Sequence, residues 1–183
     1  MKKKIFKLLT GMLLSCALAG STVAVQAEEA GTDTVKSYLT GEDVSAGVGR
    51  RRPIAVMLGN DTNGAPQSGT ENAGVIYEAP VEGSITRLMA IIEDYDNIPR
   101  IGSVRSCRDY FLFYANEYDA IYSHYGQAVY ALQYLDQHLI DNLNGLTHGN
   151  AYYRSTDRVA PQNAYTDVSQ LQAGIQSQGY SQD

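Results

Sequence analysis

The sequence has little cysteine, and this limits how the fold can be stabilised. Two cysteines occur in 183 residues, and Cys16 lies in an N-terminal segment with the features of a secretion signal. Cys107 therefore has no partner for an intramolecular disulfide. The fold must be held by a hydrophobic core, and the roughly 130 residues after Arg52 are enough for one domain but not for two.

A long apolar run occurs only at the N-terminus, and no later stretch could span a bilayer. Lysines at positions 2–4 precede this run, and Val25-Gln26-Ala27 has the small residues that signal peptidase prefers. We therefore predict a signal peptide over residues 1–27. The alternative is a lipobox over residues 13–16, which would leave Cys16 lipidated and anchored to the outer face of the membrane. Both alternatives place the mature protein outside the cytoplasm, either secreted or lipid-anchored.

Positive charge is scarce in the predicted mature chain. Cleavage after Ala27 removes four of the 14 lysines and arginines and none of the 20 acidic residues, which leaves a net charge near −10. This balance argues against nucleic acid as a partner, because binding to phosphate backbones needs a cationic surface. Nine of the ten remaining cations are arginine, which is favoured for bidentate contacts with carboxylate or phosphate. The alternative role is internal pairing with acidic residues.

Tryptophan is absent and phenylalanine is rare, whereas tyrosine is abundant. The chain has 14 tyrosines and three phenylalanines, and ten of the tyrosines lie between Tyr110 and Tyr165. Tyrosine suits the wall of a wet groove for sugar or peptide. For most of these residues we expect core packing with hydrogen-bonded hydroxyls.

Short apolar runs alternate with helical segments after a polar stretch. Residues 28–52 are polar and contain glycine, which predicts a flexible tether. Continuous or β-branched runs then predict buried strands, and longer segments with caps predict helices. The expected strands lie at 54–58, 73–80, 84–95 and 120–123 and near Tyr152 and Asn163; the expected helices lie at 106–116, 127–137 and 167–178. In the second helix we expect Ala128, Leu132 and Leu135 to face inward. We predict a single α/β domain over residues 53–183, a mixed sheet flanked by helices, with α+β as the alternative.

The stretch RIGSVRSCRDY, residues 100–110, places arginines at the predicted start of a helix. Ser106 and Asp109 form a capping-box variant, with Arg105 just before the cap and Arg108 in the first turn. A cation there costs about 0.3–1 kcal/mol unless a negative group lies nearby. We therefore predict a site for phosphate, sulfate or carboxylate at this helix N-terminus. The alternative is that both arginines pair with Glu78, Glu82 or Glu93.

Further residues could complete such a site. His124 lies at the carboxyl end of a predicted strand, where open α/β sheets bind ligands. Arg87 and Arg158 could add cations. Glu78 and Glu82 are four residues apart and could act as paired carboxylates, but we expect them to form salt bridges with Arg87 or Arg105.

No signature in the sequence establishes a reaction. Cys107 lies between two arginines, which would lower its pKa and make it a nucleophile if it were exposed. The alternative is a small buried hydrophobe. His138 and His148 lack metal-ligand spacing to His124, and no glycine-rich phosphate loop or serine elbow is present. Catalytic residues stay unknown, and we expect neither a cofactor nor a metal site.

Several blocks resemble a known family in order and spacing. RPIAVMLGN, PQSGTENAGVIYEAPVEGSITRLMAII, IGSVRSCRDYF and EYDAIYSHYG are similar to the signature of the bacterial YerB-like envelope lipoproteins, whose function is unknown. The resemblance covers residues 51 to about 167. It implies lipid anchoring, an alanine at the position of Cys107, and a second domain. The chain would then correspond to the N-terminal portion alone.

A weaker resemblance suggests a ligand class. The order TRLMAIIEDY, IPRIGSVRS and YDAIYSHYGQ is similar to the LytR-CpsA-Psr group, extracytoplasmic transferases that hold a lipid pyrophosphate with arginines. The resemblance implies roles for Arg87, Arg100, Arg105 and Arg108 as the matching cations, with Asp94 and Asp109 as the nearest candidates for a divalent metal.

Three functions follow as expectations. The first is an extracytoplasmic domain that binds an anionic cell-wall fragment, glycan or phosphate group through its arginine cluster. The second is a phosphotransferase or hydrolase acting on a pyrophosphate-linked envelope lipid or polymer. The third is a protein-interaction module using the tyrosine-rich surface. The oligomeric state stays open.

Overall fold

The structure is a computed structural model that describes residues 33–183. The predicted signal peptide and Cys16 lie outside this range. The strands are β1 (Thr34–Lys36), β2 (Asp43–Ser45), β3 (Ile54–Gly59), β4 (Val75–Pro80), β5 (Thr86–Ile92), β6 (Ile101–Gly102), β7 (Ile121–His124), β8 (Asn142–Asn144), β9 (Tyr153–Arg154) and β10 (Ala164–Thr166). The helices are α1 (Ala46–Gly49), α2 (Asp109–Asn116), α3 (Leu132–Asp136) and α4 (Val168–Gln178).

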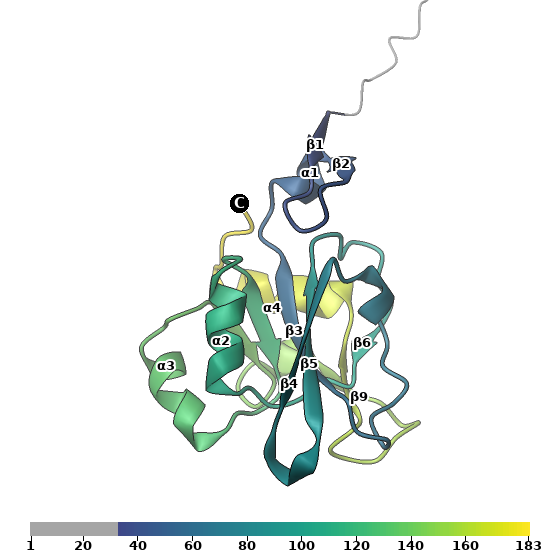
Figure 1. The fold of residues 1–183 in the computed structure, drawn as a ribbon, viewed down its shortest axis with the longest axis vertical. Helices are drawn as coiled ribbons and strands as arrows, with labels where there is room; N and C mark the ends of the chain where they lie inside the picture. The colour runs from purple at the N-terminus through teal and green to yellow at the C-terminus, as the bar shows by residue number, and fades with distance from the viewer. Residues whose placement is uncertain (1–32) are drawn as a thin grey trace, which may run out of the picture. The chain divides into compact units, whose positions relative to one another are not determined.

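A five-stranded mixed sheet in the order β4-β5-β3-β7-β8 forms the centre of this region (Figure 1). β3 pairs with β5 antiparallel and with β7 parallel, and β8 lies parallel to β7. Every residue of β3 is buried, as a continuous apolar run in a sheet covered on both faces predicts. The predicted α/β class with a mixed sheet and flanking helices is confirmed.

Two hydrophobic clusters cover the two faces of the sheet because side chains alternate along each strand. Ala55 and Met57 of β3 pack in the cluster that contains Phe111 and Leu112 of α2. Ile54, Val56 and Leu58 of β3 pack in the other cluster, which contains Leu171 and Ile175 of α4. The sheet is thus held between α2 and α4.

A second sheet, β6-β10-β9, is antiparallel and supports the loops beside the central sheet. The chain then enters α4, whose N-cap Asp167 accepts a hydrogen bond from the backbone N–H of Gln170. Gly179 ends the helix in the left-handed conformation. The helix predicted over residues 167–178 therefore agrees with α4 to within one residue.

The helix predicted over 127–137 is shorter, and its inward face is confirmed only in part, because Leu135 packs against the cluster that contains Phe111 and Leu112. A 3₁₀ turn at Val129–Ala131 precedes α3 and changes the helical phase. Ala131 is buried, whereas Leu132 is 37% exposed, so the prediction that Leu132 faces inward is wrong.

The prediction of a flexible tether is wrong for residues 33–52. Val35 pairs with Val44 in an antiparallel β1–β2 hairpin, and the Lys36 ammonium lies 3.0 Å from the Asp43 carboxylate. α1 follows, and a β-carbon at Gly49 would lie 2.6 Å from the side chain of Val35. Each short strand holds one apolar residue, and packing between these residues produces order that the polar composition conceals.

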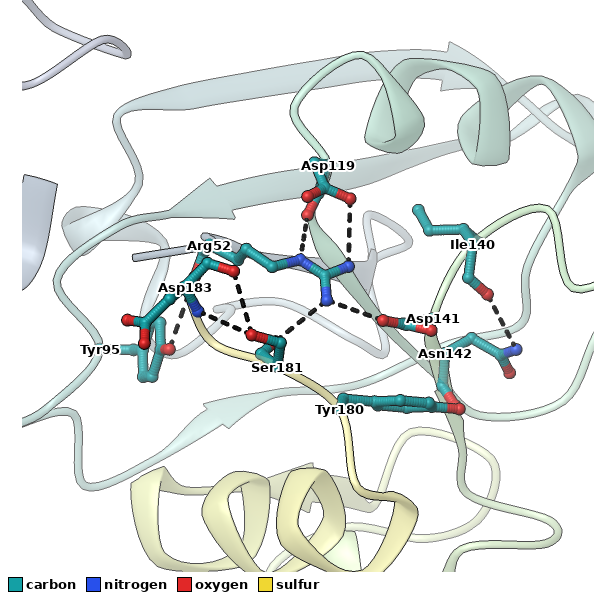
Figure 2. Close-up of polar contacts among 9 residues, drawn as sticks. All are labelled: Arg52, Tyr95, Asp119, Ile140, Asp141, Asn142, Tyr180, Ser181 and Asp183. Carbon is teal, nitrogen blue, oxygen red and sulfur yellow. Dashed lines mark hydrogen bonds and ion pairs between the residues drawn. The ribbon is translucent and has the colours of Figure 1, made fainter. Parts of the chain in front are cut away.

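Arg52 joins four segments of the chain (Figure 2). Its guanidinium donates to the backbone carbonyl of Asp119 at 2.8 Å, to the Asp141 carboxylate at 2.7 Å and to the backbone carbonyl of Ser181 at 3.0 Å. The Asp119 carboxylate lies 3.2 Å from the same guanidinium. This Arg52 clasp, formed with Asp119, Asp141 and Ser181, ties the starts of β3, β7 and β8 to the segment after α4.

Candidate functional site

Three of the predicted arginines gather around one peptide. The backbone carbonyl of Ser106 accepts hydrogen bonds from Arg87, at 2.5 Å, and from Arg108, at 3.2 Å. Arg87 comes from β5, and Arg105 and Arg108 flank Ser106 in the segment before α2. The sequence prediction that these arginines lie together therefore agrees with the structure.

Arg108 is paired inside the protein. Its guanidinium donates to both carboxylate oxygens of Glu82, with Nε 3.1 and 3.0 Å from them, and to the backbone carbonyl of Cys107 at 2.9 Å. These hydrogen bonds, together with one from Tyr130, lower the pKa of Glu82 to about 2. Arg108 is only 7% exposed, and its pairing with Glu82 confirms for this arginine the alternative to a bound anion that the sequence analysis gave.

The predicted capping box is wrong. α2 begins at Asp109, its N-cap is Arg108, and no side chain caps it. The backbone N–H of Arg105 donates to Met57 of β3 at 2.9 Å, and the Arg105 carbonyl accepts from Tyr125 at 2.9 Å. The residues before α2 are thus held extended between neighbouring segments and cannot form a helical turn. The predicted end of the helix at Asn116 is confirmed.

Arg105 differs from Arg108 in its partners. Its side chain is 13% exposed, yet within residues 33–183 its guanidinium donates no hydrogen bond, and Nη1 is buried without an acceptor. The nearest carboxylate oxygen, on Asp61, lies 3.7 Å from Nη1. The fully buried hydroxyl of Ser103 also lacks a partner in the described region.

Gly59 brings these groups together. A β-carbon on Gly59 would lie 3.1 Å from Oγ of Ser103, 3.3 Å from Cγ of Arg105 and 3.6 Å from Oδ2 of Asp61. The three side chains therefore converge on the last residue of β3. We call Gly59, Asp61, Ser103 and Arg105 the Arg105 site.

Asp61 and Arg158 shape the loop beside this site. Oδ1 of Asp61 accepts from the backbone N–H groups of Asn63 and Gly64 at 3.0 and 3.1 Å. Arg158 donates to the carbonyls of Gly64 and Pro66. Arg158 therefore fixes the loop from its far side, where Asn63 and residues 156–162 line an open cavity of about 730 Å³.

The cluster has an excess of positive charge. Burial, followed by the charges of Arg108 and Arg105, lowers the pKa of Arg87 to about 10. Burial also lowers the pKa of Arg105, which Asp61 partly offsets. Three guanidinium groups share the carboxylates of Glu82 and Asp61, so a bound anion would stabilise them.

Two predicted site residues form hydrogen bonds with neutral groups and not with the arginines. His124 is fully buried, with Nδ1 2.8 Å from the carbonyl of Gly126 and Nε2 3.1 Å from Oδ1 of Asn142, and burial lowers its pKa. Glu78 accepts hydrogen bonds from Asn60 and Thr86, at 3.0 and 2.6 Å. The predicted salt bridges of Glu78 and Glu82 with Arg87 or Arg105 are wrong, because Glu82 pairs with Arg108 and Glu78 with neutral groups.

Cys107 has no features of a nucleophile. The side chain is fully buried, and burial raises the pKa of the thiol to about 12. The thiol is therefore protonated at neutral pH, as for a small buried hydrophobe.

Asp94 and Asp109 do not meet. Asp94 follows the end of β5 and lies 3.6 Å from Arg51. Asp109 is next to Arg108, which shares an acceptor with Arg87 at the other end of β5.

Sequence reasoning missed Gly59, Asp61 and Ser103. Gly59 and Asp61 lie where buried β3 ends, a position at which α/β sheets bind ligands, and this could have signalled them. Ser103 carries no such signal, because its lack of a partner arises from packing.

Comparisons with known proteins cover most of the chain. A family model described as "Protein of unknown function (DUF3048) N-terminal domain" matches residues 39–181. A Bacillus subtilis (strain 168) protein named "Putative lipoprotein YerB" is 35% identical over 163 residues, which are 86% of this chain and 49% of that protein. The crystal structure of YerB from Bacillus subtilis matches with a TM-score of 0.77 at 34% identity, covering 81% of this chain and 51% of that chain. The chain thus spans about half the length of these relatives.

None of the helices in residues 33–183 combines the length and the apolar character needed to cross a bilayer.

Proposed function

The chain belongs to the DUF3048 N-terminal domain family, and on that basis we propose that it is an envelope domain that binds an anionic group at the Arg105 site. The YerB-like resemblance inferred from the sequence agrees with this membership. The relative's name describes a lipoprotein, which supports a location outside the cytoplasm. A lipid anchor on Cys16 would provide the membrane association.

The bonding state of Arg105 carries the proposal. A buried guanidinium nitrogen with no hydrogen-bond acceptor, as Nη1 of Arg105 is, is costly because this donor has lost water without gaining a partner. Arg87 and Arg108 lie in the same cluster, and their donors reach the Ser106 carbonyl. An anion accepting from Arg105 would supply the missing partner.

The chemistry of the site favours an oxyanion. Guanidinium matches phosphate or carboxylate in a bidentate arrangement, and the Ser103 hydroxyl could donate a further hydrogen bond. Asp61 could accept from a hydroxyl adjoining the anion. A phosphate or carboxylate on a cell-wall fragment or glycan meets these requirements.

The proposal is binding rather than phosphoryl transfer. Transfer by analogy with the LytR-CpsA-Psr group would need acidic residues to organise a divalent metal beside the arginines. Of the candidates for that role, Asp94 follows the C-terminal end of β5, whereas Asp109 is the first residue of α2.

Thermal unfolding tests the proposal with inorganic phosphate as the probe. At a phosphate concentration about ten times Kd, linkage predicts a stabilisation of about 1.4 kcal/mol and a rise in Tm of about 3–6 °C. Arg105→Met keeps an unbranched apolar stem and removes the guanidinium charge, so it should abolish the rise.

Arg50→Ala provides the matched control. The Arg50 side chain is 65% exposed, and we expect this variant to keep the wild-type response. Sodium chloride at equal ionic strength separates specific binding from screening. A phosphate response that matches chloride, or one that survives in Arg105→Met, would contradict the proposal.

A further inference from the structure

We propose a second site, for a primary ammonium group, in an acidic cavity beside the C-terminal end of β5. The Glu93 carboxylate would be its counter-charge. Glu93 directly follows β5, whereas Arg87 lies at the start of this strand. The two sites therefore involve different residues. This inference does not depend on anion binding at Arg105.

Glu93 carries a carboxylate that lacks partners. The residue is 6% exposed, its Oε1 is buried without a hydrogen bond, and its side chain accepts none within residues 33–183. The nearest arginine, Arg51, donates to the backbone carbonyl of Glu93 at 3.1 Å. The Arg51 guanidinium pairs with Asp96 at 2.7 Å and Asp94 at 3.6 Å, so it does not neutralise Glu93.

A cavity of about 230 Å³ adjoins this carboxylate. Glu93 lines it together with apolar side chains from the 33–50 segment and from the turn before β4. The apolar lining residues are Leu39, Val44, Val48 and Ala73, and the other acidic ones are Glu42, Glu71 and Asp94. An unpaired, buried carboxylate at an apolar cavity with an acidic rim suits a cation with an aliphatic stem.

The arrangement favours an organic cation over a metal ion. Across residues 33–183, no three acidic, histidine or cysteine side chains converge closely enough to hold a metal. Apolar walls suit methylene groups, as on a lysine side chain. A compact ammonium fits a small cavity better than planar guanidinium does. The ligand class is therefore a lysine-like primary amine, an ammonium group on an aliphatic stem.

Calorimetric titration with Nα-acetyl-lysine methylamide tests the assignment. We expect binding to the wild-type chain and to Arg105→Met, which alters only the other site. Glu93→Gln should weaken binding by about thirtyfold or more, because it removes one charge of a buried pair. The norleucine analogue, which has the same stem without the amine, should not bind measurably.

A second variant keeps the test decisive if Glu93→Gln does not fold. Ala73→Leu fills the cavity and leaves the carboxylate unchanged, and Ala73 has an extended backbone that leucine also adopts. We expect this variant to lose binding. Binding of the lysine derivative that survives in Ala73→Leu or Glu93→Gln, equal binding of norleucine, tighter binding of the arginine analogue, or no binding to wild type would each overturn the proposal.

Discussion

Arg52 and Arg105 are buried to the same extent but have opposite surroundings. The Arg52 side chain is 11% exposed and that of Arg105 is 13% exposed. Arg52 donates three hydrogen bonds in the Arg52 clasp, whereas Arg105 donates none within the described residues. Burial alone therefore does not distinguish the two arginines. The presence of hydrogen-bond acceptors does.

Arg108 resembles Arg52 because its donors have acceptors, although it is next to the Arg105 site. Its guanidinium pairs with the Glu82 carboxylate, and its remaining donors form hydrogen bonds with backbone carbonyls. Hydrogen bonds to charged groups stabilise the fold, whereas an unpartnered donor costs free energy. Replacing each arginine should therefore have different effects on stability and on binding.

Loss of the Arg52 clasp should have the largest effect. Arg52→Ala removes three charge-assisted hydrogen bonds that join distant segments, so we expect a loss of about 3 kcal/mol and a fall in Tm of about 6–12 °C. Urea unfolding followed by circular dichroism measures this. Arg50→Ala is the control, since that exposed arginine should contribute less than about 1 kcal/mol. Equal losses in the two variants would remove the distinction drawn from Arg52.

Arg108→Ala should rank second. It leaves the carbonyls of Ser106 and Cys107 with fewer donors and removes the partner of Glu82, so we expect a loss of about 2–3 kcal/mol in urea unfolding. In a double-mutant cycle with Glu82→Gln, the two changes should be non-additive, because they remove the same pair. Additive losses would mean that the pair contributes nothing.

Most of the central fold could be predicted from the sequence because the patterns that determine it span only a few residues. The continuous apolar run of β3 and the caps Asp167 and Gly179 each determine structure over a few residues. The 33–52 hairpin was missed because its order depends on single contacts, such as Val35 with Val44.

The candidate site was predictable only in part. Spacing brought Arg105 and Arg108 together, but the choice of Glu82 over Glu78 as the partner of Arg108 depends on the fold. Gly83, with a φ of 77°, turns the chain beside Glu82, while Glu78 stays within β4. The missing partner of Arg105 is a property of packing that no local pattern encodes.

The Glu82–Arg108 pair should also respond to acid. The folded-state pKa of Glu82 is lowered from 4.5 to about 2, so its contribution is present above pH 4.5 and is lost as the pH falls toward 2. Because its side chain is 59% exposed, we expect about 1 kcal/mol at most. Glu82→Gln should be less stable than wild type at pH 7 and equal to it near pH 2, as measured by urea unfolding. If the difference in the free energy of unfolding between Glu82→Gln and wild type persists unchanged to low pH, the pair is not its source. Glu71→Gln is the control for general effects of removing a negative charge.

Arg105→Met should have the smallest effect on stability and therefore tests the comparison most directly. Methionine fills similar space and removes a nearly buried charge whose donors lack acceptors, while the ion pair with Asp61 spans 3.7 Å. Replacing such a group by an apolar one is often neutral, so we expect a change of less than about 1 kcal/mol in urea unfolding without added anion. A loss close to that of Arg52→Ala would mean that Arg105 is a structural brace. A small change together with loss of the phosphate response would separate binding from folding at this residue.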